Sequence, residues 1–170
     1  MRGKQIRGDK IRMRVSVICV GKLKEKYFKD AVSEYEKRLS RFCTYEIIEV
    51  ADSKIPDNAS AAECEMILKA EGDRILSKIR PNSAVIAMCV EGKPLSSEQL
   101  ADMIKNISFN TGNIVFIIGG SLGLCESVKK RADMCLSFGK ITLPHQLMRV
   151  VLSEQIYRAF KINANETYHK

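Results

Sequence analysis

The sequence predicts an α/β fold in which a parallel sheet is covered by helices on both faces. Strand-like and helix-like segments alternate five times along the chain, which is the order that such a sheet requires. The run from Ile114 to Ile118 is short, continuous and apolar, as expected of a strand buried on both faces. It ends in Gly119 and Gly120, and Gly123 follows, so the chain can turn sharply where the strand ends.

The first half of the chain supplies two strand–helix pairs. Arg14 to Val20 and Thr44 to Val50 are the predicted strands. Between them, Lys24 to Ser40 is a predicted helix, because its apolar residues fall on one side at three- and four-residue spacing. A capping box at Ser60-Ala-Ala-Glu63 predicts a second helix that runs to about Ile79.

The second half supplies three more pairs. We expect, in order, a strand over Ala84 to Val90, a helix from the capping box at Ser96 to about Ile107, the strand over Ile114 to Ile118, a short helix over Cys125 to Ala132, a strand over Met134 to Phe138 and a helix over Leu147 to Phe160. The last helix is apolar around most of its circumference. It is therefore either a central core helix or a helix shared between a core and a dimer interface, and we favour the interface.

The length and composition indicate one globular domain. A chain of 170 residues with 45% hydrophobic and 28% charged residues can bury a proper core. Residues 1–12 are polar, basic and without periodicity, so we expect a disordered N-terminal extension followed by a single domain over residues 13–170. The stretch from Lys161 to Lys170 is a polar tail without apolar periodicity, and we expect it to stay outside the core.

The net charge and the spacing of the cysteines limit the kinds of ligand and partner that the protein can be expected to bind. A net charge of +8 favours a polyanionic partner such as nucleic acid. No apolar run approaches the roughly 18 residues of a membrane helix, so no membrane contact is expected. The 6 cysteines are widely spaced, with no Cys-x-x-Cys and no Cys/His cluster, which predicts no metal site and a reduced, cytoplasmic setting.

The glycine turn after Ile118 has three interpretations. A dinucleotide fingerprint is improbable, because the glycine spacing is wrong and the turn comes late in the chain. A nucleophile elbow fits G-x-S-x-G around Ser121, with Asp133 and His145 following in triad order. The third interpretation is a cofactor pocket. Three strand ends carry glycine-bearing turns whose backbone groups suit an adenine nucleoside, at Val90-Glu91-Gly92, Ile118-Gly119-Gly120 and Phe138-Gly139-Lys140.

A resemblance decides among these interpretations. The segment I-I-G-G-S-L-G-L, the later L-S-F-G-K-I-T-L-P-H-Q-L-M-R-V-V-L-S-E-Q-I-Y-R-A-F-K-I and the terminal Y-H-K resemble SPOUT methyltransferases of the RlmH type. The opening V-I-C-V-G-K-L-K-E-K-Y and the segment V-I-A-M-C-V-E-G-K-P-L-S-S-E are similar to the same family, so the likeness runs from about Met13 to Lys170. That family methylates N3 of a pseudouridine in large-subunit (23S) ribosomal RNA.

The resemblance implies a fold and a set of partners. The fold would be an α/β knot, in which the C-terminal helix is threaded to form a trefoil, an exception to the usual rule against knots. The protein would be a homodimer that acts on the assembled ribosome and uses S-adenosyl-L-methionine. By motif match, the cofactor pocket would comprise Met88, Gly119, Gly120, Phe138, Gly139, Lys140, Ile141, Thr142 and Leu143.

The resemblance also implies catalytic residues. These are Arg158, Tyr168 and His169, with the tail reaching towards the cofactor of the partner subunit. An imidazole suits proton handling near neutral pH, and a phenol suits stacking on a base. The tail departs from the family pattern at Asn165, where glycine is frequent, and at Thr167, where proline is frequent.

The spacing of three cations on the last helix and its exit has two interpretations. Arg149, Arg158 and Lys161 either meet RNA phosphates or form an ordinary solvated face.

Overall fold

The computed structural model describes residues 12–168, and it contains the parallel sheet that the sequence predicts. Five strands lie in the order β2-β1-β4-β3-β5, and every neighbouring pair is parallel. The strands are β1 (Arg14–Val20), β2 (Thr44–Val50), β3 (Ala84–Pro94), β4 (Asn113–Ile118) and β5 (Met134–Ser137). The helices are α1 (Lys26–Leu39), α2 (Ala61–Leu76), α3 (Ser97–Asn110), α4 (Glu126–Arg131) and α5 (His145–Asn163). The predicted extension over residues 1–12 lies outside the described residues except for Arg12.

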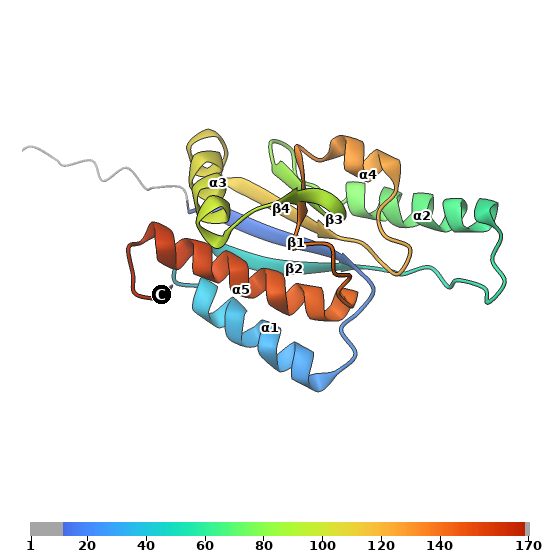
Figure 1. Ribbon diagram of the computed structural model, residues 1–170, viewed down its shortest axis with the longest axis horizontal. Coiled ribbons are helices and arrows are strands. Elements are labelled where there is room, and N and C mark those ends of the chain that lie inside the picture. Colours follow the sequence, from blue (N-terminus) through green and yellow to red (C-terminus); the bar gives the residue numbers. More distant parts are fainter. Residues whose placement is uncertain (1–11, 169–170) are drawn as a thin grey trace, which may run out of the picture.

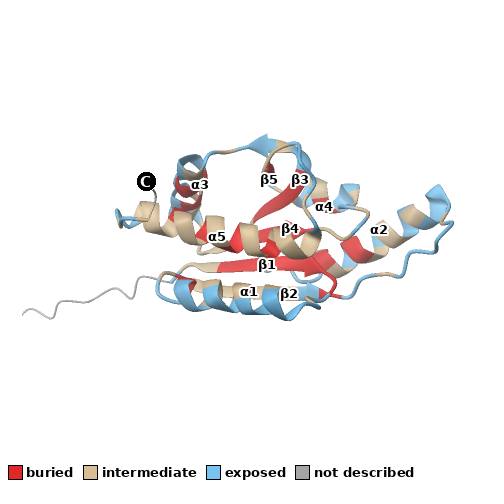
Figure 2. Ribbon diagram, turned by 60° about the horizontal axis from the view of Figure 1, so that its bottom comes forward, coloured by how far each residue is buried: buried red, intermediate tan, exposed pale blue. Residues whose placement is uncertain are grey.

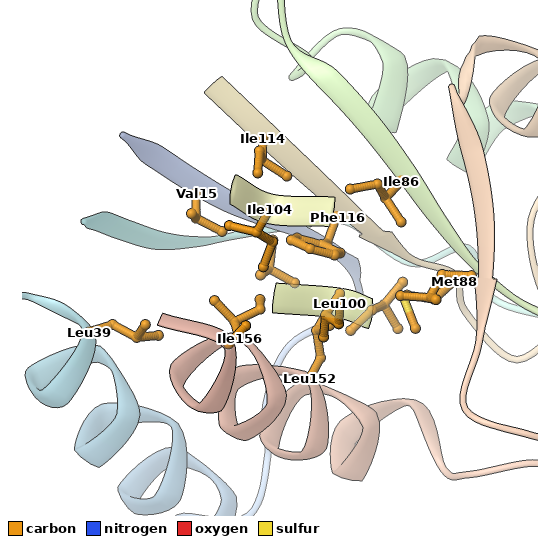
Figure 3. Packing of buried hydrophobic residues seen from close by; sticks show 14 of the residues in the cluster. Val15, Leu39, Ile86, Met88, Leu100, Ile104, Ile114, Phe116, Leu152 and Ile156 are labelled. Atoms are coloured by element: carbon orange, nitrogen blue, oxygen red, sulfur yellow. The ribbon is translucent and has the colours of Figure 1, made fainter. Parts of the chain in front are cut away.

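The helices cover both faces of the sheet (Figure 1). Helices α1, α3 and α5 pack on one face and α2 and α4 on the other, each layer over its own apolar cluster. Because side chains alternate along a strand, β4 serves both layers: Phe116 points into the first cluster and Ile117 into the second. Figure 3 shows Leu152 and Ile156 of α5 directed at the first cluster around Phe116.

Local signals set the starts of two helices as predicted. The Ser60 and Ser96 side chains each accept from the backbone N–H three residues later, and Glu63 and Gln99 each accept from the backbone of the cap residue. The predicted C-terminal ends of the helices were less accurate. Helix α2 ends at Leu76 rather than near Ile79.

Strand β3 is longer than the sequence suggests. It runs past Glu91 and Gly92 to Pro94, so the predicted end near Val90 is wrong. The register with β5 shifts within this extension, since both Met88 and Lys93 pair with Leu136. A Cβ at position 92 would lie 2.7 Å from a backbone carbon of Leu136, so the glycine is needed for close approach of the two strands.

Helix α5 begins at His145, directly after Pro144, and lies across the first face of the sheet. Leu152, Ile156 and Ala159 are fully buried there. The remaining apolar residues of α5 are only half-buried, so a second side of the helix is left partly uncovered (Figure 2): Leu147, Met148, Val150, Val151, Tyr157 and Phe160. This pattern agrees with a core role and leaves a surface for a further partner.

Arg149 serves neither of the two purposes that the sequence suggested for it. Its side chain is completely buried and forms an ion pair with Glu49, at 2.8 Å between Nη1 and Oε1. Nη2 donates to the carbonyls of Val20 (3.0 Å) and Gly21 (2.8 Å). A guanidinium presents several donors in a rigid fork, so one side chain ties α5 to the ends of β1 and β2.

The segment after α5 folds back on its own chain. The helix ends past Phe160, at Asn163, and Ile162 packs against the core, contrary to the expectation of a wholly excluded tail. Asn165 has φ of 54°, the left-handed conformation that ends many helices, and the N–H of Glu166 donates to the carbonyl of Lys161. Asn tolerates this conformation better than most residues, which explains how it stands where the family often has glycine.

Candidate functional site

A cavity opens at the carboxyl ends of β3, β4 and β5, the edge at which α/β sheets hold their ligands. Its volume is about 310 Å³, within the usual size of a small-molecule site. Backbone and apolar side chains from the three strand ends and from the start of α5 line it. They include Met88, Val90, Ile118, Gly119, Gly120, Leu122, Leu124, Leu136, Phe138, Gly139, Ile141, Thr142, Leu143, His145 and Met148.

The residues that the sequence assigned to a cofactor pocket meet at this cavity, with one exception. Lys140 is exposed and is not among the lining residues. The remaining members all line the cavity: Met88, Gly119, Gly120, Phe138, Gly139, Ile141, Thr142 and Leu143. Three strand ends that are far apart in sequence therefore form one concave surface.

The glycine turn after β4 is compact because the chain contacts itself. Gly123 donates to the carbonyl of Gly120 at 3.0 Å, and a Cβ at position 119 would lie 2.4 Å from the carbonyl oxygen of Gly123. A Cβ at position 120 would face Val20 at 3.0 Å and Glu71 at 3.2 Å, away from open space. These glycines thus have a packing role in addition to forming the cavity wall.

Ser137 fastens the loop after β5 to the end of β3. Its buried hydroxyl lies within hydrogen-bonding distance of the Val90 carbonyl (3.0 Å) and the Gly139 carbonyl (2.9 Å), and it accepts from the Gly139 N–H (3.1 Å). Sequence reasoning missed this residue. A serine directly before the phenylalanine and glycine of a strand end was the available signal, since its hydroxyl can bond to nearby backbone.

The charged groups stand at the rim, and the cavity contains a protonated thiol. Glu91 and Lys129 form an ion pair at 2.5 Å, and the ammonium holds the pKa of Glu91 below its usual value. Burial raises the pKa of the Cys89 thiol to about 12, with a further contribution from Cys135. Cys89 is therefore neutral at physiological pH and is a poor nucleophile toward an electrophilic ligand in this cavity.

Two of the residues to which the resemblance assigns catalytic roles, Arg158 and Tyr168, lie together near the other end of α5. Glu154 accepts from Arg158, at 3.0 Å from Nε and 2.7 Å from Nη2, and from the hydroxyl of Tyr168 at 3.3 Å. The Arg158 guanidinium lies 4.8 Å from the centroid of the Tyr168 ring, which also packs edge-on against Tyr157. The third residue, His169, lies outside the described residues.

This cluster and the cavity are separated along the helix. Met148 lines the cavity, whereas Arg158 follows ten positions later, a rise of about 15 Å along the helix axis. One chain therefore does not bring Arg158 and Tyr168 to its own cavity.

The nucleophile-elbow interpretation fails on the position of its acid. The carboxylate of Asp133 accepts from the N–H of Val85 at 2.8 Å, at the amino end of β3. Ser121 follows the carboxyl end of β4, on the opposite edge of the sheet. Since Asp133 cannot orient a histidine beside Ser121, the triad geometry is absent among residues 12–168.

Neither a metal cluster nor a membrane helix is found between residues 12 and 168. No group of three or more His, Cys, Asp or Glu side chains in this range is arranged to hold a metal ion. None of the helices in the same range is both long and apolar enough to cross a bilayer.

Comparison with protein families and known proteins gives a consistent result. A family model described as "Predicted SPOUT methyltransferase" matches residues 13–169. The chain is 55% identical over 159 residues to the ribosomal RNA large subunit methyltransferase H of Lactococcus lactis subsp. cremoris (strain SK11), covering 93% of this chain and 100% of that protein. The protein of the same description from Streptococcus pyogenes serotype M5 (strain Manfredo) is 55% identical with the same coverage.

Solved structures share the fold at low sequence identity. The tRNA (m1G37) methyltransferase from Aquifex aeolicus superposes with a TM-score of 0.51 at 17% identity, covering 86% of this chain and 69% of that one. A probable methyltransferase from Bordetella pertussis Tohama I superposes with a TM-score of 0.52 at 9% identity, covering 89% and 96%.

Proposed function

This chain belongs to the SPOUT methyltransferase family, and from that membership we propose that it transfers a methyl group from S-adenosyl-L-methionine to large-subunit ribosomal RNA. The observation that carries the proposal is the cavity where the ends of β3, β4 and β5 meet, in a chain 55% identical to relatives described as large-subunit ribosomal RNA methyltransferases. The chemistry of the cavity agrees with that donor.

The residues around the cavity fit the proposed cofactor. When bound, S-adenosyl-L-methionine supplies a methyl group on a positively charged sulfonium. An apolar wall of Met88, Ile141 and Leu143 accommodates the methyl donor without competing for it through hydrogen bonds. The backbone of Gly139 is open to close approach, since a Cβ at position 139 would meet nothing within 4 Å.

The acceptor that we propose is N3 of a pseudouridine, as in the family that the sequence resembles. Transfer to a ring nitrogen requires the donor and the acceptor to be held in line and the N3 proton to be removed. We assign the orientation of the base to Arg158 and Tyr168, and the proton transfer to His169. Lys140 is exposed beside the cavity, and we still propose that it contacts the cofactor.

We further propose that the active site is shared between two copies of the chain. Arg158, against which Tyr168 packs, sits about 15 Å along α5 from the cavity of its own chain, which supports contact with the cavity of a partner. The half-buried side of α5 supports a homodimer interface. The α5 helix following the β5 loop also suits the trefoil knot expected of this family, formed by a single domain over residues 13–170.

The assembled ribosome is the substrate that we propose, which places the enzyme in the cytoplasm with its substrate. The family that the sequence resembles acts on the assembled ribosome, so contacts beyond the RNA hairpin would supply affinity.

Two measurements test the proposed function. S-adenosylhomocysteine should raise the melting temperature, because a ligand that binds only the native state stabilises it. Ribosomes from a strain lacking this gene should accept a labelled methyl group, and mass spectrometry of their large-subunit RNA should place it on a pseudouridine. Absence of both a thermal shift and transfer would refute the proposal.

A further inference from the structure

A second cavity, of about 460 Å³, lies at the carboxyl ends of β1 and β2 and adjoins the first. The turn between β1 and α1, the residues after β2 and the start of α5 line it. Ser121 and His145 line both cavities, so a ligand in the second cavity would lie next to the proposed methyl donor. Figure 1 shows the β1–α1 turn passing beside the first turn of α5. The methyl-transfer chemistry does not use this second cavity.

The β1–α1 turn is held rigidly by side chains from two other elements. Gly21 has φ of 82°, and its carbonyl accepts from the buried Arg149 at 2.8 Å. Leu23 donates its N–H to Glu49 of β2 at 2.8 Å, and Lys24 donates its N–H to Gln146 of α5 at 3.1 Å. The backbone of the turn is therefore fixed before any ligand arrives, which lowers the entropy cost of binding.

The lysines on this turn form no ion pair within the described part of the chain. Lys22 and Lys24 line the cavity and are exposed, and neither forms an ion pair with any residue in the range 12–168. The carboxylate of Glu49 is compensated by the Arg149 guanidinium. Asp52 is the remaining carboxylate of the lining and lies beside Gly21, since a Cβ at position 21 would meet its side chain at 3.8 Å. Two ammonium groups on a fixed backbone suit an anion with spaced negative charges.

We propose that this cavity binds the sugar–phosphate backbone beside the methylated nucleotide, with Lys22 and Lys24 contacting phosphates. The inference rests on the proposed RNA substrate and adds a subsite to it. A phosphate contact here positions the strand, because it holds the backbone while the base enters the adjoining cavity. Tyr27, 63% exposed, follows Lys24 by three residues in the first turn of α1 and offers an aromatic ring that a base can stack on.

The test compares two double variants with equal loss of charge. Lys22→Ala with Lys24→Ala removes the proposed contacts, whereas Lys69→Ala with Lys105→Ala removes two exposed lysines that line neither cavity. Binding is measured over a salt series without cofactor, on ribosomes and on protein-free large-subunit RNA. We expect the first variant to bind both about tenfold more weakly and to lower the salt slope by about two, and the control to match the unaltered protein.

Methyl transfer supplies an independent readout. The effect of the Lys22 and Lys24 substitutions should fall on KM for ribosomes and not on kcat, and Asp52→Asn should lower KM by removing a repulsive carboxylate. Equally weakened RNA binding in both double variants would overturn the proposed subsite. Lower affinity for ribosomes with unchanged affinity for protein-free RNA would also overturn it, because that result indicates contact with a ribosomal protein. Absence of transfer by the unaltered protein would instead refute the proposed function while the binding comparison still decides the subsite.

Discussion

The residues around the first cavity are of two kinds: some pack against the rest of the protein, and others are exposed and would be buried only by a ligand. Gly120 belongs to the first kind, because its missing Cβ faces Val20 and Glu71. Ile141 belongs to the second, since 79% of this apolar residue is exposed although it lines a cavity. An exposed aliphatic side chain at the mouth of a cavity gains its burial only when the cavity is filled.

Replacing Ile141 by Ala should therefore weaken cofactor binding without affecting the fold. The lost burial is up to about 2 kcal/mol, or roughly tenfold to thirtyfold in the dissociation constant of S-adenosyl-L-methionine. Calorimetric titration measures the affinity, and a melting curve without ligand should be unchanged. Phe109→Ala is the matched control, because Phe109 is 75% exposed on α3 and lines neither cavity. Equal losses in both variants would contradict the assignment.

Cys89 provides a second test at this scale. With its pKa raised to about 12 by burial, the thiolate fraction at pH 8 is on the order of one in ten thousand. Iodoacetamide should therefore label Cys89 much more slowly than the half-buried Cys64, as followed by peptide mass spectrometry. S-adenosylhomocysteine should slow the labelling of Cys89 further and leave that of Cys64 unchanged. Rapid labelling of Cys89 at pH 8 would show that its thiol is accessible and ionised.

At the scale of elements, α5 is the helix that connects the two cavities and the cluster that we propose to be catalytic, around Arg158. Its first turn contributes His145 and Met148 to the first cavity, and His145 and Gln146 to the second. The buried Arg149 follows and fixes the β1–α1 turn. The cluster of Glu154 and Arg158 occupies its later turns. A shift of α5 would therefore disturb all three sites together.

Arg149→Met should destabilise the fold and loosen the β1–α1 turn. It leaves the carbonyls of Val20 and Gly21 without their donor and Glu49 without its cation, a loss of about 3 kcal/mol in the free energy of unfolding. Glu49→Gln should cost less, because its side chain is one-third exposed (33%) and the amide oxygen still accepts a hydrogen bond. Urea unfolding at equilibrium measures both, and equal losses would contradict the central role of Arg149.

At the scale of the whole molecule, the structure supports a site that one chain does not complete. The cavity lies near the start of α5, and the cluster of Arg158 and Tyr168 lies at its other end. The same cluster holds Tyr168 against Tyr157 of its own chain. In the proposed homodimer each chain then supplies a cavity to one site and a catalytic cluster to the other.

Mixing two inactive variants tests this arrangement. Deleting residues 168–170 removes Tyr168 and His169, which we propose to be catalytic, and should leave cofactor affinity unchanged. Leu143→Arg places a cation beside the sulfonium and should abolish cofactor binding. Heterodimers of the two should recover up to about half of the activity of the unaltered enzyme, since one intact cavity then meets one intact tail. Verified heterodimers without activity would show that each tail serves its own subunit.

The sequence by itself determined the features that depend on neighbours along the chain. Hydrophobic period and capping boxes located the strands and helices, and glycines marked the ends of β4 and β5, because these signals act within a few residues. Motif resemblance then indicated the family and eight of the residues that line the first cavity. What remained out of reach were contacts between distant segments.

Only the tertiary structure decided how those segments meet. The strand order, the extension of β3 to Pro94 and the burial of Arg149 against Glu49 each depend on pairing across long stretches of sequence. The sequence offers the same two interpretations for Arg149 and Arg158, yet the first is buried under the β1–α1 turn and the second stacks on Tyr168. The physical reason is that a charged side chain takes its role from the partners that desolvate and neutralise it, and here those partners are a hundred or more residues away for Arg149 and only a few for Arg158.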